Sequence, residues 1–156
     1  MLAFLNDIPI ITLALDRVKI SPRPSSINVK ERLVLSLLFG SVGVVNSIVL
    51  FIIMTHYFHF SLATIQTIFF LKLTVSGHAL IFVSHTKERW YKFLPSKEVI
   101  ISTLTTQVIA TALSVTGFLM PTSISWKLVL LTWIWAIFWM QVSELMKDLQ
   151  NRMLKP

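Results

Sequence analysis

The sequence contains no cysteine among its 156 residues. Disulfide bonds, thiolate nucleophiles and thiolate metal ligands are therefore all excluded. It also contains no phosphate-cradling glycine loop, no catalytic triad and no cluster of residues with metal-ligand spacing. Nothing in the sequence could bind ATP or break a covalent bond. We therefore expect that this chain alone binds no cofactor, has no metal site and catalyses no reaction.

Charged residues are scarce as well. They make up 13% of the sequence, about half the share of a typical soluble domain. Hydrophobic residues reach 54% and the mean hydropathy is +0.74. Several runs of about twenty residues are almost free of charge, which is typical of transmembrane helices. The sequence therefore predicts an all-α, polytopic transmembrane helix bundle in a lipid bilayer, with one partial and four full spans.

The net charge of +7 is unevenly distributed. Most basic residues fall in residues 16–32, in residues 85–97 and in the tail 148–156, all on one predicted side of the membrane. This is the positive-inside pattern, so we place these segments and the C-terminus in the cytoplasm of a multi-pass plasma-membrane protein. Lipid headgroups account for the charge, and we expect no nucleic-acid partner.

The four full spans are expected at residues 33–55, 62–84, 99–119 and 126–146, within a four-helix region 33–147. Residues 1–15 form a shorter apolar segment. At 1.5 Å per residue, a helix over the fourteen residues 2–15 spans about 21 Å, less than the hydrocarbon core of about 30 Å. We therefore expect a partial span from a truncated chain, a split gene product or a decayed copy, or a span that needs an unusual neighbour.

This short segment carries Asp7, followed two positions later by Pro9. A carboxylate in a membrane helix is a functional-site candidate, because ionisable groups are costly there. Pro9 has no N–H to bond the carbonyl of Leu5, so that oxygen is free to face a cavity. A carboxylate beside a freed carbonyl suits a proton or another cation. The alternative is that Asp7 is solvated near a frayed N-terminus.

Lys72 is the second ionisable group within a predicted span. Its charge must snorkel to the interface, meet a carboxylate or be lost with a proton. The functional interpretation is a counter-charge to Asp7 or a block against proton backflow; the structural one is an inter-helix pair or a snorkelling side chain. We interpret His78, in the same span, as a hydrogen-bonded packing residue in preference to a proton relay.

Two further patterns concern packing. Gly40, Gly43 and Ser47 form a small-residue stripe along which another helix could approach closely. Glu144 and Asp148 lie four residues apart on one helix face, which we interpret as solvated and not as an ion site.

Several motifs resemble one protein family. Leu5-Asn6-Asp7 is followed by the sequence TLALDRV, which begins at Thr12, and by Ser21-Pro22-Arg23-Pro24. This order resembles the sixth membrane helix and following loop of plasma-membrane-type P-type proton-transporting ATPases. Residues 78–90, 106–115 and 125–140 resemble the eighth, ninth and tenth helices, so the resemblance covers essentially the whole chain as the C-terminal membrane portion, helices six to ten.

The resemblance implies that Asp7 accepts and releases the transported proton, with Asn6 as its neighbour. It also implies a partner, the missing N-terminal part of the pump, where ATP and Mg²⁺ would act. Lys72 departs from the family, because plant relatives carry glutamine there. The alternative is a stand-alone small membrane protein, a passive conduit or accessory scaffold subunit without ATP-driven activity, in which Asp7 and Lys72 form a structural ion pair. One carboxylate does not distinguish H⁺ from other cations.

Overall fold

The computed structural model describes residues 1–16, 29–86 and 88–153. Within them the chain is helical and contains no strand. The motif at Ser21–Pro24 and the basic residues Arg17, Lys19, Arg23 and Lys87 lie outside the described residues, as does the end of the tail, residues 154–156. The all-α fold predicted from the sequence is confirmed.

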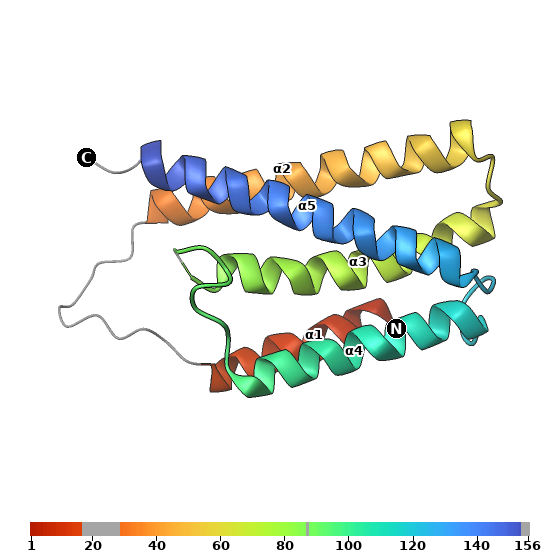
Figure 1. Cartoon of the computed structure of the whole chain (residues 1–156), viewed down its shortest axis with the longest axis horizontal. Coiled ribbons are helices and arrows are strands. Elements are labelled where there is room, and N and C mark those ends of the chain that lie inside the picture. The colour runs from red at the N-terminus through yellow and green to blue at the C-terminus, as the bar shows by residue number, and fades with distance from the viewer. Residues whose placement is uncertain (17–28, 87, 154–156) are drawn as a thin grey trace.

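The helices are arranged around α3 (Leu62–Ser84). Figure 1 shows α3 between α2 (Val29–Ile52) and α5 (Trp126–Met153) on one side and α1 (Leu2–Thr12) and α4 (Lys97–Thr116) on the other. α3 packs against α5, α4 and α1, while α1 also packs on α4 and α2 on α5. The residues of α3 that face these neighbours include Leu71 and Val75, both buried.

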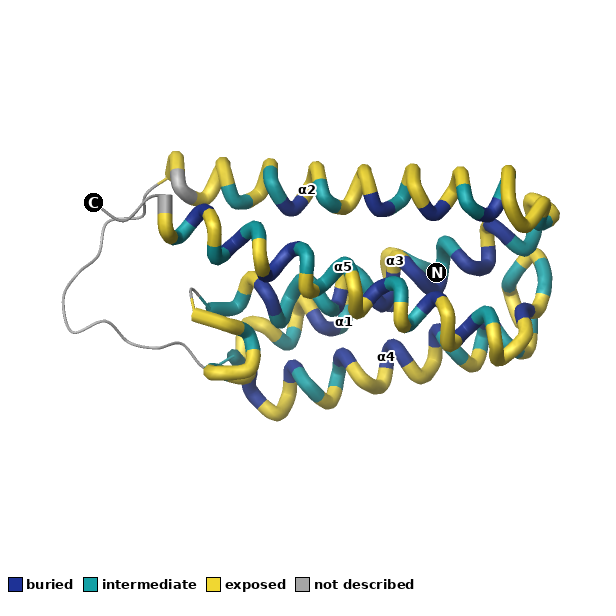
Figure 2. Tube along the Cα trace, turned by 45° about the horizontal axis from the view of Figure 1, so that its top comes forward, coloured by how far each residue is buried: buried dark blue, intermediate teal, exposed yellow. Residues whose placement is uncertain are grey.

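Four helices of the described residues are long and apolar enough to cross a membrane: Arg32–Tyr57, Leu62–Ser84, Lys97–Thr116 and Trp126–Arg152. A shorter apolar helix, Leu2–Leu15, precedes them. It consists of α1 and a 3₁₀ turn, η1 (Leu13–Leu15). One partial and four full spans are therefore confirmed. Much of the outer surface is apolar, and Figure 2 shows exposed positions along every helix.

Several helix ends follow from local chemistry. Ser61 and Ser96 are the N-caps of α3 and α4, where their hydroxyls accept hydrogen bonds from the backbone N–H groups of Thr64 and Val99. α4 ends at Thr116, earlier than the apolar run suggests, because Gly117 adopts a left-handed conformation with φ of 72°. At the far end of α2, a π-helical turn, η2 (Ile53–Tyr57), leads into the connection to α3.

The predicted small-residue stripe on α2 is not a close helix contact. A Cβ atom built on Gly40 or Gly43 would meet no other heavy atom within 4 Å. Among the described residues, no helix makes the close approach that the sequence predicts at these two glycines. α2 instead meets α5 through larger side chains around Asn46, which is buried.

Candidate functional site

Asp7 lies on the exposed face of α1. Phe4 and Ile11 share that face and are 66% and 71% exposed, whereas Leu5 and Pro9 are buried on the opposite face. The helix alternates in this way because residues three and four positions apart lie on the same side. The carboxylate therefore points away from the helices that the structure describes.

Asn6 points inward, toward α3. Its amide packs against Gly77, where an added Cβ would lie 3.8 Å from Asn6 Oδ1. That oxygen is buried and has no hydrogen-bond partner among the described residues. Two adjacent residues of α1 thus have opposite environments: Asn6 packs against α3, and Asp7 is exposed.

His78 lies between α3 and α1. It is 1% exposed, and its imidazole is near the backbone of Leu5, whose carbonyl cannot bond to Pro9. Neither ring nitrogen has a hydrogen-bond partner in the described part of the chain. His78 is therefore buried at the contact between α3 and α1, beside the Leu5 backbone, and its packing role stays a prediction.

Lys72 is buried on the other side of α3. It is 2% exposed, and its Nζ donates a hydrogen bond of 2.7 Å to Ser47 Oγ of α2. The ammonium also lies 5.9 Å from the centroid of the Phe69 ring. Across the described ranges, no ion pair joins Lys72 to Asp7, since Lys72 is directed to α2 and Asp7 lies on α1.

The end of α1 is fixed by polar contacts. Thr12 Oγ1 donates to the carbonyl of Pro9 at 2.7 Å and lies 2.8 Å from Ser102 Oγ of α4. Asp16 accepts a hydrogen bond from the backbone N–H of Ser96 at 2.7 Å and pairs with His85 Nδ1 at 2.6 Å. These contacts hold the C-terminal end of α1 and the following turn η1 against α4 and the loop between α3 and α4.

A second polar cluster holds this loop against α5. Lys147 is 2% exposed and its Nζ lies 3.0 Å from Glu144 Oε1, which also accepts from the backbone N–H of Trp90. Lys147 donates as well to three backbone carbonyls at the end of α3 and in the loop, those of Val83, Thr86 and Glu88, at 2.8, 3.3 and 2.8 Å.

The interpretation of Glu144 as part of a solvated face is therefore wrong, because the loop covers it and leaves it 6% exposed. Asp148, one turn further on, stays at the edge and pairs with Arg89 at 3.2 Å. A hydrogen bond to Tyr91, together with the Asp148 carboxylate, raises the pKa of Arg89. The sequence signal that could have indicated the buried pair is the i, i+3 spacing of Glu144 and Lys147.

Comparison with known proteins adds independent evidence. No protein-family model matches the chain. It is 37% identical over 156 residues, 99% of its length, to a "Putative cation-transporting ATPase" of Methanocaldococcus jannaschii. It is 30% identical over 127 residues, 76% of its length, to a "Probable plasma membrane ATPase" of Dictyostelium discoideum. The chain spans 19% of the first relative and 12% of the second. These similarities confirm that the chain resembles the C-terminal membrane portion of P-type ATPases.

Proposed function

We propose that this chain is the C-terminal transmembrane segment of a P-type proton pump, in which Asp7 is the membrane carboxylate that accepts and releases the proton. The observation that supports this most strongly is the exposure of Asp7 on an apolar helix face, between Phe4 and Ile11. A carboxylate facing lipid is costly. Such a face is therefore best explained as a contact surface for further membrane helices.

The length of the relatives supports this explanation. The chain spans about a fifth of the cation-transporting ATPase of M. jannaschii, so a complete pump would have further chain to cover the Asp7 face. In this proposal, the missing N-terminal part of the pump is the partner of α1. It would supply the groups that hydrogen-bond or pair with the carboxylate.

The proton cycle then follows from the surroundings of Asp7. Desolvation favours the neutral, protonated carboxyl group, whereas water or a cationic neighbour favours the carboxylate. A pump that alternates these two environments takes up the proton on one side and releases it on the other. Asn6, fixed against Gly77, would hold this turn of α1 in place while the environment of Asp7 changes.

Lys72 would contribute differently. Because it is bound to Ser47, it would act as a fixed positive charge within the bundle and oppose the backflow of protons, with no direct pairing to Asp7. ATP and Mg²⁺ would bind to other parts of the complete pump. Among the described residues, no group of three His, Cys, Asp or Glu side chains could hold a metal ion.

We also propose the orientation that the charges favour, with the C-terminus and the loop between α3 and α4 in the cytoplasm. The loop carries Arg89 and Lys92, both exposed. The relative from D. discoideum is named for the plasma membrane, which supports that location for this chain.

The test is proton transport by the complete pump containing Asp7→Asn, reconstituted in vesicles. ATP-dependent acidification should be abolished in Asp7→Asn and retained at least in part in Asp7→Glu, the control that keeps a carboxylate. Undiminished acidification by Asp7→Asn would overturn the assignment. Asp7-dependent uptake of another cation, with no acidification, would support the assignment as a pump but show that the transported ion is not the proton. A passive leak through vesicles containing this chain alone would favour the stand-alone conduit.

A further inference from the structure

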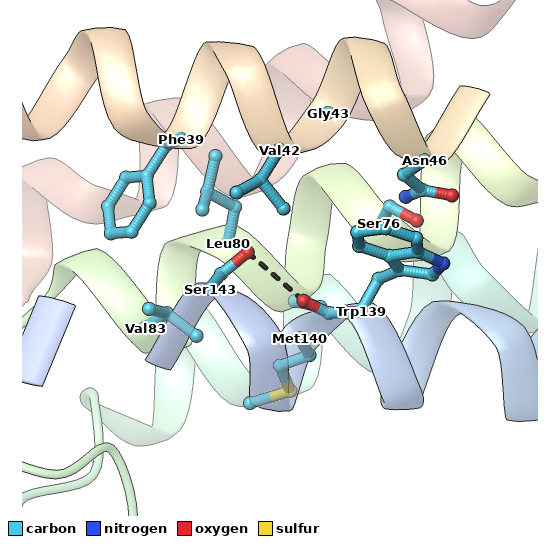
Figure 3. Close-up of a pocket in the computed structure, with 11 residues that line it drawn as sticks. Phe39, Val42, Gly43, Asn46, Ser76, Leu80, Val83, Trp139, Met140 and Ser143 are labelled. Atoms are coloured by element: carbon cyan, nitrogen blue, oxygen red, sulfur yellow. Dashed lines mark hydrogen bonds between the residues drawn. The ribbon is translucent and has the colours of Figure 1, made fainter. Parts of the chain in front are cut away.

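A small cavity lies between α2, α3 and α5. Its volume is about 60 Å³. Figure 3 shows its lining: Gly43 and Asn46 come from α2, Ser76 from α3, and Trp139 and Ser143 from α5. It is separate from the Asp7 face, because none of its lining residues comes from α1.

Two polar atoms of this lining have no hydrogen-bond partner among the described residues. They are the hydroxyl oxygen of Ser76 and the indole nitrogen of Trp139, and both atoms are buried. Asn46 is 3% exposed and accepts a hydrogen bond of 2.6 Å from Trp135 Nε1 with its Oδ1. Its amide N–H groups therefore remain available to the cavity. The lining thus brings together two unsatisfied polar atoms, one from α3 and one from α5, and the Asn46 amide of α2.

Such groups need a partner at this depth. Lipid chains offer no hydrogen bond, and an unpaired polar group away from water is costly. Polar cavities in proteins are filled by ordered water when they exceed about 10–15 Å³ and offer two to four polar partners. This cavity meets both conditions.

We propose that the cavity between α2, α3 and α5 binds water, one molecule or a few, bridging Trp139, Ser76 and Asn46. A water oxygen can accept from the Trp139 N–H and from the Asn46 amide, and it can donate to Ser76 Oγ. A metal cation is disfavoured because no carboxylate lines the cavity. An anion is disfavoured because Lys72 does not line it.

The bound water explains how α2 is attached to the rest of the bundle. A Cβ on Gly43 would meet nothing within 4 Å, so the glycine leaves open space that water can occupy. Just beside the cavity, Ser47 donates to the carbonyl of Gly43 at 2.8 Å and accepts from Lys72. The water would therefore extend these hydrogen bonds, which join α2 to α3 and α5 beside the packed side chains of the three helices.

The first test is NMR of the full chain in detergent micelles, with ¹⁵N-labelled tryptophan and each indole signal assigned by Trp→Phe substitution. The Trp139 N–H should show a cross-peak to water. The Trp135 N–H, which donates to Asn46, is the matched control and should show none. If Trp139 lacks the cross-peak while the exposed Trp126 shows one, the cavity is dry and the proposal is wrong.

The second test compares Gly43→Val with Gly40→Val. Both glycines lie on α2, and a Cβ at either position meets open space, but only Gly43 lines the cavity. Gly43→Val should abolish the water cross-peak of Trp139, and Gly40→Val should leave it unchanged. A cross-peak of equal strength in both variants would contradict the assigned water site, as would its loss in both.

Discussion

Asp16 and His85 lie 2.6 Å apart, carboxylate Oδ2 to imidazole Nδ1, and the side chains of both are 7% exposed. The pair joins the end of the Asp7 segment to the end of α3. His85 also stacks in parallel on Phe93 of the following loop, with ring centroids 5.4 Å apart. Contacts at the C-terminal end of α1 and η1 thus fix the position of α1, while the face of α1 that carries Asp7 stays exposed.

We predict that Asp16→Ala destabilises the chain by about 1.5–3 kcal/mol, the range for a hydrogen bond to a charged group. The substitution removes the partner of His85 and also the acceptor of the Ser96 N–H. Unfolding by sodium dodecyl sulfate in mixed micelles measures the change. Asp16→Asn keeps an acceptor oxygen and should lose less. Equal losses in the two variants would show that the Ser96 hydrogen bond contributes nothing.

Lys147 should be among the most sensitive positions. Lys147→Met removes a cation from three backbone carbonyls and leaves Glu144 buried without its ionic partner. Breaking a buried pair from one side costs about 3–5 kcal/mol. The same unfolding measurement should show a loss of that size.

The matched control for this cluster is the exposed pair one turn away. Arg89→Gln removes the contact with Asp148 and should change stability little, because exposed ion pairs are weak. The double variant Lys147→Met/Glu144→Leu should recover part of the loss by removing the unpaired carboxylate. If the double variant is less stable than Lys147→Met alone, the carboxylate is not the source of the penalty.

Gly117 and Gly40 should respond to alanine in opposite directions. At Gly117 the φ of 72° disfavours any side chain, and a Cβ would lie 3.0 Å from the backbone nitrogen of Ser123. Gly117→Ala should therefore destabilise by about 1 kcal/mol or more. Gly40 is in helix α2 with open space around its Cβ position, so Gly40→Ala should stabilise by about 0.5–1 kcal/mol. Thermal unfolding followed by circular dichroism distinguishes the two signs.

Much of the fold could be predicted because membrane spans and their ends depend on local chemistry. Long apolar runs with few charges predict the four spans. Proline has the same missing N–H wherever it lies, so the sequence also predicts that the Leu5 carbonyl accepts no hydrogen bond from Pro9. The family resemblance likewise rests on short motifs such as Leu5-Asn6-Asp7.

Which residues of each helix face the other helices, and which face outward, could not be predicted in the same way. In a soluble helix, polar and apolar residues divide between two faces, but lipid and protein interior are both apolar, so the outer and inner faces of a membrane helix look alike. The pattern at Gly40 and Gly43 therefore predicts a helix contact, whereas the space beside both glycines is open. Likewise, the pattern at Glu144 predicts a solvated side chain, whereas the side chain is buried.

By itself, the sequence determined that this is a helical membrane protein and where its candidate spans lie, and it predicted that Asp7 is an ionisable group at membrane depth. Only the tertiary structure decided that Asp7 is exposed while Asn6 is half-buried against Gly77, that Lys72 is bound to Ser47, and that α2, α3 and α5 together line a small cavity. The reason is physical: composition and backbone chemistry act along the chain, whereas the environment of a side chain depends on which helices pack against it.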